Sequence, residues 1–235
     1  MPLQEPDKLS ESKEIEKHKS CVSIVPIFNH LEDDEMNSIV KSAIHLNLEK
    51  NEILYRAGDY SDSLYIVHKG KVRVYRLSEN GREQLIRILN PGEFTGELAL
   101  FRESVHEVYA EAMEQTEICS IQRGDLQQIL QQHPTISLKI LNEFSKRLDN
   151  TEHLMTSFAT ENVETRIALY LVQQAEDSEL DNIVLPMSRK DLASYLGTTP
   201  ETISRKLAKF EDEGWIHQKD PRSIEILDIK SLQSV

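Results

Sequence analysis

Glycine recurs at a nearly constant interval through the first half of the chain. Four glycines stand 12, 11 and 11 residues apart, each beside a polar turn residue: Gly58, Gly70, Gly81 and Gly92. The segments between them alternate apolar and polar residues, as half-buried strands do. Turn signals at this spacing predict an antiparallel sandwich or barrel from Val22 to Gln122. The clearest predicted strands are Ser63–Val67, Lys71–Leu77, Arg82–Leu89, Glu107–Glu111 and Glu117–Ile121.

After Gly124 the apolar period becomes that of a helix. We expect one helix at Asp125–Gln132 and a second, beginning near Pro134, that runs to about Thr160. Six residues of the second helix follow one another at steps of three and four: Leu141, Phe144, Leu148, Thr151, Met155 and Phe158. This heptad seam predicts a homodimer, with Thr151 as its weakest layer. The alternative is that the seam packs on the chain's own β domain.

The composition excludes several classes of protein. The 235 residues carry 27 Lys and Arg against 40 Asp and Glu, a net charge of −13. The longest apolar run, Ile167–Val172, is far too short for a membrane span. The first twenty residues mix both charges without an apolar secretion signal, so we expect a cytoplasmic protein. Since attraction to phosphate provides most non-specific affinity for DNA, a DNA reader here must concentrate its positive charge locally.

Two short helices with a tight turn are expected near the C-terminus. Ser188 and Asp191 resemble a capping box that opens the first helix, which Gly197 ends. Thr199 is a good N-cap and Pro200 a good first helical residue, so the second helix should run to about Glu211. This arrangement is a helix-turn-helix.

The second of these helices has two distinct faces. One face is apolar and would seat the helix on its domain: Ile203, Leu207 and Phe210. The opposite face carries Glu201, Ser204 and Arg205, whose side chains can read base edges in the major groove. Three basic residues and one acidic residue make the segment Thr199–Phe210 locally positive. The residues predicted to bind DNA are Thr199, Glu201, Ser204, Arg205, Arg189, Lys206 and Lys209.

Two alternatives remain for these charged residues. Glu201 and Arg205 could form only a surface ion pair four residues apart, although this would not explain the caps, the proline and the turn. Gly214–Leu227 continues as strand, turn and strand, the shape of a wing. Lys219 and Arg222 at its tip either contact phosphate or only solvate the turn.

The order of roll, long helix and winged helix-turn-helix resembles the CRP/FNR family of bacterial transcription regulators. The best local signatures are Gly-Glu-Leu-Ala-Leu at 96–100 and Glu-Thr-Ile-Ser-Arg at 201–205. The second is similar to the FNR branch, which implies that Glu201, Ser204 and Arg205 read a TTGA…TCAA palindrome as a homodimer.

The resemblance also implies the fold and the divisions of the chain. The fold class is α+β, with an N-terminal antiparallel β-roll of the cyclic-nucleotide-binding (jelly-roll) kind, a long dimerisation helix and a C-terminal winged helix-turn-helix. The expected divisions are a polar tail at 1–20, the β-roll sensor at 21–124, a linker with the dimerisation helix at 125–160 and the DNA-binding domain at 161–235.

The family's cyclic-nucleotide site is only partly present. Glu97 matches the glutamate that meets the ribose, but His106 and Glu107 stand where an Arg-Ser pair should clamp the cyclic phosphate. A glutamate there would repel the ligand, so we do not expect cyclic AMP to bind. A regulator gated by a cyclic nucleotide or another small ligand, or by no ligand, is the alternative reading.

The resemblance gives the two cysteines a role. Cys119 matches the central cysteine of FNR and Cys21 lies in the region of its N-terminal cysteine cluster. Two cysteines are too few for a [4Fe–4S] cluster within one subunit, but they can form one disulfide, as in the similar Flp-type proteins of Gram-positive bacteria. The alternatives are that Cys119 is simply a small buried residue, or that Cys21 and His18 hold a metal.

An enzyme of the cupin type would need clustered histidines, and no His-x-His occurs in the sequence. We therefore expect no catalytic site, no metal site and no cofactor. The expected partners are double-stranded DNA, a second copy of the chain and RNA polymerase, with no membrane.

Overall fold

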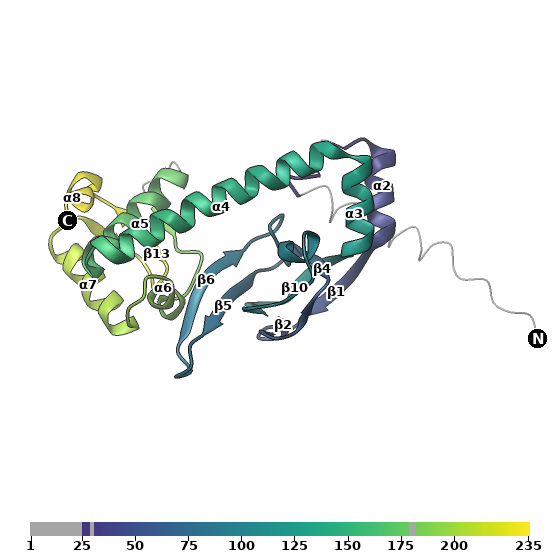
Figure 1. Ribbon diagram of the computed structural model, residues 1–235. Helices are drawn as coiled ribbons and strands as arrows, with labels where there is room; N and C mark the ends of the chain where they lie inside the picture. The colour runs from purple at the N-terminus through teal and green to yellow at the C-terminus, as the bar shows by residue number, and fades with distance from the viewer. Residues whose placement is uncertain (1–24, 29–30, 179–181) are drawn as a thin grey trace, which may run out of the picture. The chain divides into compact units, whose positions relative to one another are not determined.

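The computed structural model describes residues 25–28, 31–178 and 182–235. The chain forms two compact units (Figure 1). The first runs to Arg76 and resumes from Leu89 to Ser145, and the second comprises Leu77–Ile88 and Lys146–Val235.

An antiparallel β-roll precedes most of the helices of the chain. Its strands form two four-stranded sheets, ordered β1-β10-β4-β7 and β2-β9-β5-β6, and a short pair, β3-β8. The strands are β1 (Ala43–Leu48), β2 (Ile53–Tyr55), β3 (Tyr60–Ser61), β4 (Ser63–Lys69), β5 (Val72–Leu77), β6 (Glu83–Leu89), β7 (Phe94–Thr95), β8 (Ser104–Val105), β9 (Tyr109–Ala112) and β10 (Thr116–Gln122). The strands expected from the alternating pattern are confirmed, and a 3-10 turn, η1 (Glu97–Leu100), follows β7.

One segment expected to be strand is a helix. Helix α2 spans Asp33–Ser42. Its residues Met36, Ile39 and Val40 are buried at the i, i+3 and i+4 spacing of a helix face. The prediction of short strands throughout this region is therefore wrong at α2, because glycine spacing reports turns and not the structure before the first of them.

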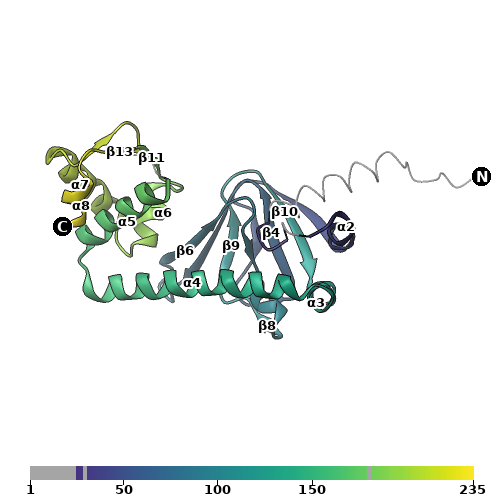
Figure 2. The same cartoon turned by 90° about the horizontal axis from the view of Figure 1, so that it is seen from above.

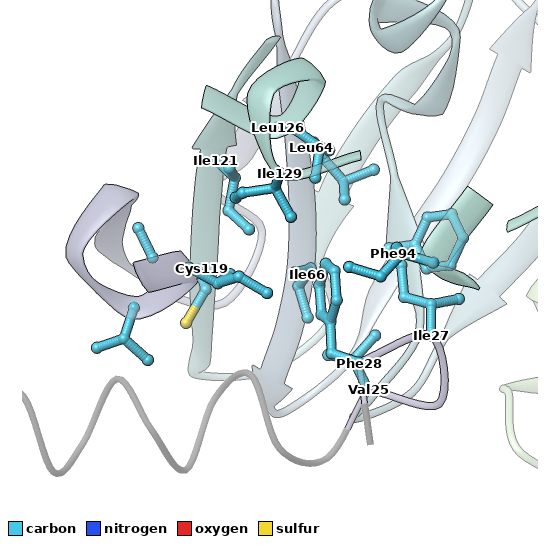
Figure 3. Close-up of a cluster of buried hydrophobic side chains, with 14 of the residues drawn as sticks. Val25, Ile27, Phe28, Leu64, Ile66, Phe94, Cys119, Ile121, Leu126 and Ile129 are labelled. Carbon is cyan, nitrogen blue, oxygen red and sulfur yellow. The ribbon is translucent and has the colours of Figure 1, made fainter. Parts of the chain in front are cut away.

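One buried cluster of the roll joins the sheet β1-β10-β4-β7 to the flanking helices. Figure 3 shows ten labelled members of a buried cluster, among them Ile66 and Phe94 from the strands and Leu126 from α3 (Arg123–Gln132). Figure 1 places α2 and α3 beside β1 and β10. Ile136 and Ile140, near the start of α4 (Pro134–Thr160), complete this cluster.

Beyond this first stretch, α4 leaves apolar side chains uncovered. Leu141, Leu148 and Met155 are 55%, 61% and 68% exposed in the single chain. Phe144 packs partly against the roll's core and lies 5.7 Å from the Phe101 ring. Thr151 is exposed and donates a hydrogen bond to the Arg147 carbonyl.

The second unit carries the predicted winged helix-turn-helix (Figure 2). Its three-stranded sheet is ordered β11-β13-β12. The elements are α5 (Val163–Ser178), β11 (Asn182–Val184), α6 (Arg189–Tyr195), α7 (Pro200–Asp212), β12 (Ile216–Gln218), β13 (Ser223–Ile226) and α8 (Ile229–Gln233). Both predicted helices and both wing strands are confirmed.

Candidate nucleic-acid interface

Helix α6 begins and ends as its sequence predicts. The Ser188 hydroxyl oxygen accepts a hydrogen bond from the Asp191 N–H and donates to the Asp191 carboxylate. Gly197 has φ of +66°, in the left-handed region. A Cβ added there would lie 3.1 Å from the Phe158 ring. The turn between the two helices therefore suits glycine both for its backbone conformation and for its packing.

Helix α7 is seated by its apolar face. The Thr199 hydroxyl caps it by accepting the Thr202 N–H at 3.3 Å, and Pro200 opens the first turn. Ile203, Leu207 and Phe210 are completely buried. The opposite face must therefore point to solvent.

That opposite face presents the three predicted reading residues. Glu201, Ser204 and Arg205 are all exposed. The pKa of the Glu201 carboxyl is lowered by its own backbone N–H and by the Thr199 side chain. Glu201 is thus ionised at neutral pH, a hydrogen-bond acceptor beside the guanidinium donor Arg205.

Arg189, also predicted to bind DNA, is held within the domain. Its Nη2 donates to the Gln218 side-chain oxygen at 2.6 Å, and its Nε to the Pro221 carbonyl at 3.2 Å. Its Nη1 lies 3.5 Å from the Ser204 hydroxyl oxygen. Arg189 therefore lies beside the reading face but is engaged with the wing.

Lys206 and Lys209 have a partner that the sequence analysis missed. Both ammonium groups contact the Glu164 carboxylate on α5, Lys209 at 2.6 Å. These two hydrogen bonds are the main reason that the pKa of Glu164 is lowered. The prediction that Lys206 and Lys209 contact DNA remains untested, but in this structure their charges stabilise the seating of α7 on α5.

Some charged side chains at the wing tip form hydrogen bonds and ion pairs within the domain. Lys219 donates to the Asn182 side chain at 2.6 Å and pairs with Glu225 at 3.0 Å. Asp220 accepts hydrogen bonds from the N–H groups of Arg222 and Ser223. The Ser223 side chain, followed by these two N–H groups, lowers the pKa of the Asp220 carboxyl. The Arg222 side chain is exposed and lies at the tip.

Segment Leu77–Ile88 of the second unit contacts α6, which no sequence signal indicated. The Ser194 hydroxyl accepts the Leu85 N–H and donates to the Glu83 carbonyl, both at 2.8 Å. The Gln84 amide donates to the Ser194 carbonyl at 2.6 Å. These partners lie about 110 residues apart in the chain, beyond the reach of local patterns.

In the roll, the residue in place of the family's arginine is buried against aromatic rings. The His106 ring stacks on Tyr55, with 3.7 Å between centroids. The Tyr55 hydroxyl is hydrogen-bonded to Thr95 at 2.6 Å. Burial lowers the pKa of His106, although the carboxylates of Asp59, Asp62 and Glu97 act in the opposite direction. A neutral imidazole is a poor substitute for a guanidinium as a phosphate clamp.

Of the two cysteines, only Cys119 falls in the described part of the chain. It is fully buried on β10, and its sulfur lies 3.9 Å from Nδ1 of His45 on β1. The His45 Nε2 lies 3.2 Å from the Glu117 carboxylate. Cys21 and His18 lie outside the described residues, so the predicted pairing and the weaker metal alternative are not tested by the structure.

Among residues 25–28, 31–178 and 182–235, no group of three or more His, Cys, Asp and Glu could hold a metal ion. No helix in the same residues is both long and apolar enough to cross a membrane.

Comparison with known families agrees with this geometry. Residues 45–133 match the family described as "Cyclic nucleotide-binding domain", and residues 165–235 match "Crp-like helix-turn-helix domain". A roll of the first kind joined to a reader of the second defines a DNA-binding transcription regulator.

Similarity to individual proteins identifies the family. The chain is 31% identical over 214 residues to the Lacticaseibacillus casei protein named "Probable transcriptional regulator flp", covering 91% of this chain and 97% of that protein. It is 31% identical to the transcriptional activator Anr of Pseudomonas protegens, over 87% of this chain and 84% of that one. The solved structure of FixK2 from Bradyrhizobium japonicum, 26% identical, superposes with a TM-score of 0.71 over 82% of this chain and 96% of that one. The protein belongs to the CRP/FNR family.

Proposed function

We propose that the protein is a homodimeric regulator that reads a TTGA…TCAA palindrome in the major groove through α7. The observation that carries the proposal is the two-faced geometry of α7. Its apolar face is completely buried, and this leaves Glu201, Ser204 and Arg205 exposed on the other side. A recognition helix needs its polar contacts on one uncovered face near its N-terminus.

The three side chains offer complementary chemistry to a G·C pair and its neighbours. Arg205 can donate two hydrogen bonds to guanine O6 and N7, a contact that discriminates by about 1–3 kcal/mol. The ionised Glu201 can accept from the cytosine amino group. Ser204 is placed between them in the sequence and can reach a further base edge.

A comparison of two duplexes tests this reading. Affinity is measured at one fixed salt concentration for the TTGA…TCAA duplex and for one in which both G·C pairs are replaced. We expect wild type to prefer the first by at least about tenfold, and Arg205→Ala to lose this preference. Arg102→Ala, which removes an exposed arginine of the roll, is the matched control. Equal affinity of wild type for both duplexes would refute the proposal.

Dimerisation is supported by the uncovered seam of α4. The exposed leucines and methionine of this helix need a partner surface, and a second copy supplies the two-fold symmetry of a palindrome. Such a dimer presents two α7 helices to two half-sites. We further propose RNA polymerase as the partner through which the bound dimer regulates, and the cytoplasm as its location.

For the signal, we propose a reversible disulfide between Cys21 and Cys119. The support is the resemblance of the two cysteines to those of Flp-type proteins. DNA affinity and thiol count are measured on reduced and oxidised protein. We expect a change of about tenfold or more together with the loss of two thiols per chain, and neither change in Cys21→Ser. Equal affinity in both states excludes the cysteines as the sensor.

We also propose that the roll works without a bound cofactor. The stacked, buried His106 replaces the arginine that would clamp a cyclic phosphate, which supports this view. Calorimetric titration with cyclic AMP should give no heat of binding. Saturable binding of one cyclic AMP per chain would instead favour the alternative of a nucleotide-gated regulator.

A further inference from the structure

Arg189 links the start of α6 to the wing. Two of its nitrogens donate to wing acceptors, the Gln218 side-chain oxygen at 2.6 Å and the Pro221 carbonyl at 3.2 Å. A guanidinium has five donors and no acceptor. Both contacts therefore consume donors that a phosphate-binding arginine would direct to DNA.

Gln218 extends this link to the far end of α7. Its side-chain nitrogen and its backbone N–H donate to the two oxygens of Glu211, each at 2.8 Å. A carboxylate only accepts and a guanidinium only donates, so one orientation of the Gln218 amide satisfies both neighbours. Glu211, Gln218 and Arg189 thus join α7, the wing and α6 in one continuous hydrogen-bonded chain.

The third contact of Arg189 reaches the reading face. Its Nη1 lies 3.5 Å from the Ser204 hydroxyl oxygen. Because the guanidinium can only donate, the Ser204 oxygen acts as the acceptor in this contact. The hydroxyl proton is then directed elsewhere, and the exposed side of Ser204 faces solvent.

We propose that Arg189 is a positioning residue that fixes the wing against α7 and makes Ser204 a hydrogen-bond donor toward DNA. A donor selects acceptor atoms on the base edge, namely purine N7, guanine O6 or thymine O4, and disfavours the cytosine amino group. Arg189 then sets specificity without contacting DNA. The inference rests on the proposed function for its DNA part.

The wing contact is tested without DNA. Hydrogen exchange is followed at the Lys219 and Leu185 amides, which donate to Ser223 and Arg222 carbonyls in the wing. We expect Arg189→Lys to accelerate exchange at these two amides by about tenfold or more. Lysine keeps the positive charge but lacks the planar set of guanidinium N–H donors that contact the wing. Lys190→Gln, at the exposed neighbouring residue, is the control and should change nothing. Unchanged wing exchange in Arg189→Lys would overturn the inference.

The specificity role is tested with DNA. Affinities are compared for TTGA duplexes substituted at each position, and the position where Ser204→Ala loses discrimination marks its base pair. We expect Arg189→Lys to lose about three- to tenfold discrimination at that same pair, the range of one hydrogen bond. The double variant should lose no more than either single variant.

The salt dependence separates positioning from a phosphate contact. If Arg189 bound phosphate, Arg189→Met would lower the slope of log affinity against log salt by about 0.9. We expect that slope to stay unchanged while discrimination falls. A lowered slope with intact discrimination overturns the inference. If wild type does not prefer the TTGA duplex at all, the proposed function fails, and wing exchange alone still decides whether Arg189 holds the wing.

Discussion

Leu148 provides a quantitative test of the dimer seam on α4. Its side chain is 61% exposed in the single chain. Complete burial of a leucine side chain stabilises by about 1.5–3 kcal/mol, so covering this exposed part contributes about 1–2 kcal/mol. In a symmetric dimer the residue counts twice. Leu148→Ala should therefore weaken dimerisation by about 2–4 kcal/mol, or raise the dissociation constant roughly 30- to 700-fold.

Sedimentation equilibrium at several protein concentrations measures this constant directly. Leu227→Ala is the matched control, because Leu227 is similarly exposed at 56% but lies outside α4. The thermal midpoint of the monomer should hardly change, since Leu148 is exposed within its own chain. A dimer constant unchanged by Leu148→Ala, or a wild type that stays monomeric, would refute the reasoning that the seam joins two copies. A large loss of monomer stability would instead favour packing on the chain's own β domain.

Three further perturbations probe the domains separately. Thr199→Ala removes the cap of α7 and should lower the free energy of unfolding by about 1 kcal/mol in urea titrations, with Thr199→Ser restoring most of it. Because burial lowers the pKa of His106, the folded state favours the neutral ring. The contribution of His106 to the free energy of unfolding is fully present above about pH 6.5, the pKa of an unfolded histidine, and is lost as the pH falls through the lowered pKa of the folded state. His106→Gln should flatten this pH dependence in thermal scans. Glu164→Gln should release Lys206 and Lys209 from their ion pairs. Fluorescence anisotropy should then show a higher affinity for a random duplex and a steeper slope of log affinity against log salt. An unchanged slope would show that neither lysine can reach DNA.

The helix-turn-helix of α6 and α7 could be predicted from the sequence because its signals are local. Ser188 and Thr199 satisfy backbone N–H groups within three residues, and both caps form as expected. Gly197 supplies a backbone conformation that other residues rarely adopt. The apolar spacing of α7 then decides which side chains remain outside. Each of these choices depends on neighbours within one or two helical turns.

The partners of the charged side chains near α7 could not be predicted in the same way. The sequence around Lys206 and Lys209 shows no acidic partner for both of them. Their shared partner, Glu164, lies 42 and 45 residues earlier in the chain. Arg189 finds its strongest partner 29 residues later. Only the folded arrangement of α5, α7 and the wing brings these groups together. The sequence pattern therefore identified the helix-turn-helix, but not the partners that these charged side chains have within the domain.

The contact between Ser194 and β6 affects how readily this edge strand can pair with another molecule in concentrated solution. β6 is the last strand of its sheet, and an uncovered last strand offers its backbone to any extended chain nearby. One serine hydroxyl occupies both the Leu85 N–H and the Glu83 carbonyl. The Ser194 side chain therefore occupies one donor and one acceptor of β6 that would otherwise be available to a strand of another molecule.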